Sequence, residues 1–142
     1  MTSASAKTFD GNGNSYATLN QGGAGTLTIT SDNTFKNITN TVQPATVSFG
    51  AGTTTTVTEG FGLSGTSGNL ITIGSAQAAA HTITKTFGAD VIVSYCSISY
   101  STVDATGWYA PSNYGNVNGG NNTNWLFTAI VTALGNMFLI FM

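Results

Sequence analysis

The sequence predicts an all-β protein and, within that class, a right-handed parallel β-helix made of one domain. Short runs of β-branched and aromatic residues alternate with clusters of Gly, Asn and Ser, and no helical pattern interrupts them. The apolar centres Leu27, Val47, Ile71 and Val91 follow one another at intervals of 20, 24 and 20 residues, a loose repeat that suits stacked turns of a solenoid. A β-sandwich or jelly roll also has short strands separated by turns and is the alternative.

The first residues predict a flexible arm followed by a tight turn. Residues 1–8 are small and polar, so we expect them to form an N-terminal arm outside the β domain of residues 9–127. Residues 10–15 then resemble a calcium loop, because Asp10, Asn12 and Asn14 occupy its first three ligand positions. Ser15 replaces the invariant Gly of that loop, which favours a plain turn, and no metal or other cofactor is expected.

The next segment is a glycine-rich turn that leads into a strand. Residues 22–30 are similar to the nonapeptide of calcium-binding β-rolls, except that Leu27 stands where a ligand Asp belongs. Alternation places Leu27 and Ile29 on one face of the strand. Further strands are predicted at residues 34–39, 45–49, 53–58, 61–63, 70–73 and 81–86.

Residues 89–100 form the densest β-forming run in the interior of the chain. Apolar side chains fall on both alternating faces, so we expect one continuous buried strand with neighbours on both sides. Cys96 is the single cysteine and cannot form an internal disulfide. Its place in this run predicts a small buried hydrophobic residue.

The charge content excludes two classes of partner. Only 6% of the residues are charged, with 3 Lys, no Arg and 5 acidic residues, so the chain has neither the cationic footprint of a nucleic-acid binder nor a polybasic membrane patch. Thr, Ser, Asn and Gly must solvate the surface, as is typical of extracellular and virion β proteins. Residues 1–7 also lack the apolar run of a signal peptide, which suits a virion protein that is assembled inside a host cell and released by lysis; a mature or truncated secreted protein is the alternative.

Several segments carry a resemblance to a known group. They are residues 33–38 (Asn-Thr-Phe-Lys-Asn-Ile), 46–57, 65–72 and 119–127. Together they resemble repeat-type β-helical segments of bacteriophage structural proteins and of bacterial surface proteins, over about residues 9–127. The resemblance transfers no catalytic residue and implies a non-enzymatic virion protein, foremost a capsid decoration or cement protein. Its alternatives are a tail-fibre or carbohydrate-binding adhesin module and a subunit of a self-assembling extracellular fibre at the cell surface.

Two groups of side chains are candidate sites. His81 is the only imidazole and Ser75 and Asp90 could complete a triad, but no Gly-x-Ser-x-Gly motif is present, so a structural His is expected. A candidate contact with a surface glycan or with another subunit is formed by Trp108, Tyr109 and Tyr114. These aromatic residues lie beside several Asn, and such rings can stack on sugars or cap an interface.

Residues 128–142 form an apolar, uncharged C-terminal arm. The apolar, uncharged stretch from Leu126 to Met142 is barely long enough to span a bilayer, it has no basic flank, and Gly135 and Asn136 interrupt it, so a membrane anchor is disfavoured. An apolar surface of this size is expected to be covered by other copies of the chain, with a trimer as our estimate, or by the major capsid protein. The residues expected at that contact are Leu134, Met137, Phe138, Leu139, Ile140, Phe141 and Met142.

Overall fold

The computed structural model describes residues 1–131 and confirms the all-β class. The predicted contact residues Leu134, Met137, Phe138, Leu139, Ile140, Phe141 and Met142 lie outside the described residues. Within them the only helix is the single 3-10 turn η1 (Ser112–Tyr114), and none is long and apolar enough to cross a membrane. The strands are β1 (Lys7–Asp10), β2 (Ser15–Gln21), β3 (Leu27–Thr30), β4 (Asn33–Asn40), β5 (Ala45–Phe49), β6 (Thr54–Gly62), β7 (Ile71–Ser75), β8 (His81–Lys85), β9 (Val91–Ile92), β10 (Cys96–Ile98), β11 (Ser101–Val103), β12 (Trp108–Tyr109) and β13 (Val117–Asn118).

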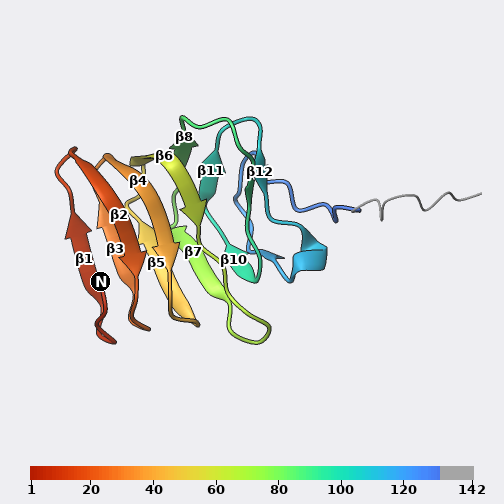
Figure 1. Cartoon of the computed structure of the whole chain (residues 1–142), viewed down its shortest axis with the longest axis horizontal. Helices are drawn as coiled ribbons and strands as arrows, with labels where there is room; N and C mark the ends of the chain where they lie inside the picture. Colours follow the sequence, from red (N-terminus) through yellow and green to blue (C-terminus); the bar gives the residue numbers. More distant parts are fainter. Residues whose placement is uncertain (132–142) are drawn as a thin grey trace, which may run out of the picture.

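The strands form parallel sheets between which the chain alternates (Figure 1). Sheet A has the order β1-β3-β5-β7-β10-β13, sheet B has the order β11-β8-β6-β4-β2, and β12 pairs with β9. Two parallel neighbours in a sheet need a long connection between them. From β1 to β8, each such connection contains one strand of the other sheet. Sandwiches and jelly rolls are antiparallel, whereas all pairings between the described strands are parallel, so this alternative is wrong.

The register confirms the first predicted interval and corrects the next two. Leu27 lies opposite Val47, as the interval of 20 residues predicted. Val47 then lies opposite Ile73 rather than Ile71, and Ile71 lies opposite Cys96 rather than Val91. The segments between the strands differ in length along the chain, so the number of residues between paired positions varies, although no register shift occurs within the strand pairs of sheet A.

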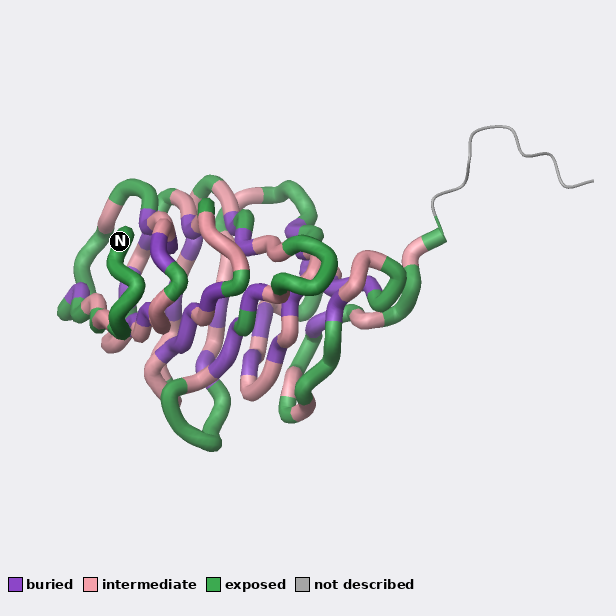
Figure 2. The backbone as a smooth tube through the Cα atoms, turned by 90° about the horizontal axis from the view of Figure 1, so that it is seen from below, coloured by how far each residue is buried: buried purple, intermediate pink, exposed green. Residues whose placement is uncertain are grey.

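The core lies between the inner faces of the sheets, where buried segments follow the strands (Figure 2). Alternate side chains of β3 and β5 point inward, so Leu27, Ile29 and Val47 are fully buried. Burial of each such side chain stabilises the fold by about 1.5–3 kcal/mol before ordering costs. The predicted strands 53–58 and 61–63 are joined in β6, because a register shift beside Phe35 accommodates the extra residues.

The prediction of one continuous strand over residues 89–100 is wrong. The segment forms β9 and β10, which belong to different sheets. The chain turns between them at Tyr95, whose φ of 51° lies in the left-handed region. Val91 and Val93 point inward before the turn, and Cys96 and Ile98 point inward after it. The inward-pointing residues therefore have odd numbers before the turn and even numbers after it, which is why both alternating sets of side chains in the run are apolar. Burial of Cys96 is confirmed.

The N-terminal segment is shorter than the predicted arm. Lys7 and Thr8 belong to β1 and pair with β3. Further upstream, the amino group of Met1 donates a hydrogen bond of 3.0 Å to the carbonyl of Asn20. The backbone of the first residues therefore follows the end of β2 and the glycine-rich turn.

Candidate functional site

The outer face of sheet B carries rows of threonine side chains. Because side chains alternate along a strand, Thr55 and Val57 point into the core and their even-numbered neighbours point out. Parallel register then aligns outward residues of successive strands. The half-buried outward residues form what we call the threonine face: Thr34, Thr54, Thr56, Thr58, Thr82, Thr84 and Thr102.

The threonine hydroxyls are placed by register rather than by local sequence. Thr54 lies opposite Thr82, which lies opposite Thr102. Thr56 lies opposite Thr84, and their hydroxyl oxygens are 3.1 Å apart, within hydrogen-bonding distance. The face therefore offers ordered hydroxyls that can donate and accept, and it contains no strong nucleophile.

A hollow of about 430 Å³ lies at the β2 side of this face, lined by Ser15, Tyr16, Ala17, Thr34, Lys36 and Thr58. The Tyr16 ring stacks on Phe35 with 5.6 Å between centroids, and Phe9 meets it edge-on at 4.9 Å. These contacts fix the aromatic edge of the hollow. Its volume falls in the lower part of the range for small-molecule sites.

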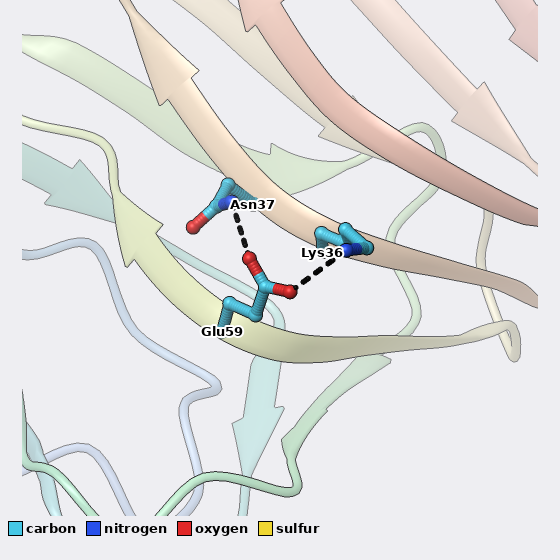
Figure 3. Close-up of polar contacts among 3 residues, drawn as sticks. All are labelled: Lys36, Asn37 and Glu59. Carbon is cyan, nitrogen blue, oxygen red and sulfur yellow. Dashed lines mark hydrogen bonds and ion pairs between the residues drawn. The ribbon is translucent and has the colours of Figure 1, made fainter.

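An exposed polar group borders the hollow (Figure 3). Lys36 Nζ lies 3.0 Å from Glu59 Oε1, and Asn37 Nδ2 donates a hydrogen bond of 3.4 Å to Glu59 Oε2. The hydrogen bond and charge of Lys36 hold the pKa of Glu59 below its usual value. The sequence does not indicate that these residues meet, because their contact depends on the register between β4 and β6.

No proton relay is formed by Ser75, His81 and Asp90. Ser75 Oγ donates to the carbonyl of Phe49, and Asp90 is exposed. His81 is fully buried, its ring stacks on Phe49 at 4.6 Å, and neither ring nitrogen has a hydrogen-bond partner among the described residues. Burial lowers the pKa of His81 to about 4. The imidazole is therefore a neutral core residue at physiological pH.

The calcium-like turn uses its carboxylate locally. Asp10 Oδ1 accepts a 2.8 Å hydrogen bond from the Ser31 hydroxyl and a 3.1 Å bond from the backbone N–H of Asn12, and these bonds lower the pKa of Asp10. Such bonds are typical of an Asx turn. Within residues 1–131, no three His, Cys, Asp or Glu side chains come close enough to hold a metal ion.

The three aromatic residues predicted as a contact surface do not lie together on the outside. Trp108 is fully buried between the rings of Phe61 and Trp125, with centroid distances of 5.4 and 5.3 Å. Its indole therefore has no free face for a sugar, and its part in the predicted contact is wrong. Tyr109 and Tyr114 are half-buried, and their role as contact residues stays a prediction.

No family model, curated protein or solved structure in the comparisons matches the chain. The candidate surface is therefore interpreted from its chemistry. Ordered hydroxyls, one amide and one exposed ion pair can hydrogen-bond to a partner. This chemistry suits recognition or assembly.

Proposed function

We propose that the chain is a non-enzymatic structural protein of a bacteriophage virion, foremost a capsid decoration or cement protein that associates with its own copies and with the major capsid protein. In this proposal sheets A and B are faces of one right-handed β-helix. The observation that carries it is the unbroken parallel register of sheet A from β1 to β13, with the strands of sheet B between. A chain stacked in this way forms a rigid rod in which each turn rests on its neighbours.

The surface chemistry supports an assembly role. Hydroxyls of the threonine face replace charges as the solvating groups, and only 6% of the residues are charged. Uncharged hydroxyl surfaces can approach another protein without the desolvation cost of buried ions. A DNA contact is not part of the proposal, because three Lys cannot neutralise a phosphate backbone.

A second candidate is a subunit of a self-assembling extracellular fibre. It is favoured by the open ends of the sheets, since β2 ends sheet B at one side and β13 ends sheet A at the other. Free strand edges are templates for further strands. The carbohydrate-binding adhesin or tail-fibre alternative loses its main support, because Trp108 is buried; any glycan contact would have to use Tyr109 and Tyr114.

Electron microscopy distinguishes these candidates. Gold-labelled antibody raised against the purified chain is applied to purified virions and to the extracellular fraction of the same culture. We expect regular labelling of capsids. Labelling of filaments alone would favour the fibre, labelling of tail tips would favour the tail-fibre module, and absence of label from virions would overturn the proposal.

A further inference from the structure

The N-terminal edge of sheet B is open over most of β2. In the described chain β2 pairs with β4 on one side only. Ser15, Ala17 and Thr18 are exposed, and Tyr16 is half-buried although its ring belongs to the aromatic cluster at this end of the core. A parallel strand added here would continue sheet B and cover that ring.

The free part of the edge is limited by Met1. The Met1 amino group donates to the Asn20 carbonyl at 3.0 Å, and the Gly22 N–H donates to the Met1 carbonyl at 2.7 Å. This is the hydrogen-bond pattern of a residue that lies beside Gln21 in a parallel ladder. An added strand therefore has the six residues from Ser15 to Asn20 beside it, although the Asn20 carbonyl is already bonded to Met1.

The edge also lacks the features that normally prevent strand addition. Edge strands are commonly protected by Lys or by Pro. Residues 15–20 (Ser-Tyr-Ala-Thr-Leu-Asn) contain neither, and they contain no charge. At the other end of the molecule β13 has only two residues and is followed by Gly119 and Gly120, so it offers a much shorter edge.

We propose that the occupant of this edge is the segment 137–142 of a second copy, which adds to β2 as a parallel strand. This segment (Met-Phe-Leu-Ile-Phe-Met) has six residues, no charge and no Pro, and it matches the free length of β2. Its side chains would cover Tyr16 and Phe9 at the open end of the core. The inference rests on the self-association in the proposed function and names its acceptor site.

The segment cannot come from the same copy. Sheet B has five strands and the Thr102–Thr123 bridge adds one more level, so the position beside β2 lies six steps from Thr123. At the usual strand spacing that is about 29 Å. If residues 137–142 pair with β2, the six residue steps from Val131 to Met137 can span at most about 22 Å, and Ile130 is bonded to Asn113 in η1, away from β2 (Figure 1).

The described chain also ends on the wrong side for an intramolecular contact. Ile130 exchanges two hydrogen bonds with the side chain of Asn113 in η1, which places it at the end of the molecule opposite β1 and β2 (Figure 1). A contact between the C-terminal end of one copy and the N-terminal edge of the next is heterologous. Such contacts form a ring where the rotation closes and a fibre where it does not.

Complementary full-length variants test the inference. Thr18→Lys places a charge on the acceptor edge and leaves the donor segment intact, whereas Phe138→Glu/Ile140→Glu blocks the donor and leaves the edge intact. Thr72→Lys is the matched control, because Thr72 is also exposed but lies on β7 inside sheet A. Sedimentation velocity over a range of concentrations measures the mass of the assemblies. Circular dichroism checks the fold of each variant. If the Thr18→Lys variant does not fold, Ala17→Lys takes its place.

The expected outcome is specific to a donor and an acceptor. Wild type and Thr72→Lys associate, and each blocked variant associates at least about tenfold more weakly, a change equivalent to about 1.4 kcal/mol. An equimolar mixture of the two blocked variants forms a 1:1 heterodimer and nothing larger. If Thr18→Lys or Ala17→Lys associates like wild type, the β2 site is overturned and the proposed self-association stands. If wild type stays monomeric at every concentration, the self-association itself is overturned.

Discussion

Different groups stabilise two regions of the described chain. In the first region, from β1 to β8, the strands reach nine residues, and backbone ladders join each to its neighbours. In the second region, from β9 onward, no strand exceeds three residues, and Asn side chains supply many of the bonds between successive parallel segments. Long strands depend on alternation of apolar residues, whereas the short ones depend on individual amides.

Buried polar atoms show the same contrast. In the described chain, the buried side-chain atoms without a hydrogen-bond partner belong to Gln21, Asn33, Thr55 and His81, all within the first eight strands. In the last part, Asn116 bonds to three backbone groups. The first region therefore tolerates unpaired polar groups because its ladders and core stabilise it, while the second requires its polar groups to be satisfied.

The largest effect is expected from Trp108→Ala. The indole is fully buried between Phe61 and Trp125, and its removal leaves a cavity at the junction of the two regions. The free energy of unfolding should fall by about 3–5 kcal/mol, measured by chemical denaturation. Ile92→Ala is the control, because Ile92 lies in the paired strand β9 but is 50% exposed, and it should change stability far less. Equal effects of the two variants would contradict a core role for Trp108.

Acid should weaken the first region through His81. Burial lowers the pKa of this residue to about 4 from an ordinary value of 6.5, so the unfolded chain binds a proton at a higher pH than the folded one. The stability that comes from the neutral imidazole is complete above pH 6.5 and is lost as the pH falls to about 4. The loss is on the order of 3 kcal/mol. Urea titrations at several pH values should show this dependence in wild type and a flatter curve in His81→Phe; the same slope in both would exclude His81 as the cause.

Removal of one amide should weaken the second region. Asn116 Oδ1 accepts from the Cys96 N–H at 2.9 Å, and Nδ2 donates to the carbonyls of Val93 and Pro111 at 2.8 and 3.0 Å. Asn116→Ala leaves these buried groups unpaired and should cost about 2–4 kcal/mol. Asn113→Ala, at an exposed position, is the control. Hydrogen exchange should report faster exchange of the Cys96 amide. An unchanged rate would show that a group other than Asn116 protects this amide.

Substitutions of Cys96 test whether the turn between β9 and β10 depends on packing or on polar contacts. The thiol is fully buried, lies 3.4 Å from the carbonyls of Leu63 and Ser94, and burial raises its pKa to about 12. Cys96→Ser should destabilise by about 1–3 kcal/mol, because the fold must then bury a polar hydroxyl whose shorter C–O bond holds it farther from these carbonyls than the thiol, while Cys96→Val should be nearly neutral. Thermal melts measure both. Rapid labelling of the native thiol would contradict its burial.

The sequence predicts the first region better than the second for a physical reason. The predicted strand at residues 45–49 agrees with β5, and the prediction at 81–86 differs from β8 by one residue, because short alternating runs bounded by turns carry their own signal. The turn at Tyr95 carries no such signal, since a non-glycine residue adopts a positive φ there. The threonine face also could not be predicted, because aligned residues lie 28 positions apart between Thr54 and Thr82 but 20 apart between Thr82 and Thr102.

The smallest effect is expected at the ion pair on the outer face of the first region. The side chains of Lys36 and Glu59 are 60% and 52% exposed, so water screens their attraction and ordering two long side chains offsets it. Glu59→Gln should leave the denaturation midpoint unchanged within error at neutral pH. Because the pKa of Glu59 is lowered from 4.5, any contribution of its carboxylate is present above that pH and disappears as the pH falls further. A clear loss of stability at neutral pH that high salt does not reduce would show that the register shift between Phe35 and Asn37 depends on this contact.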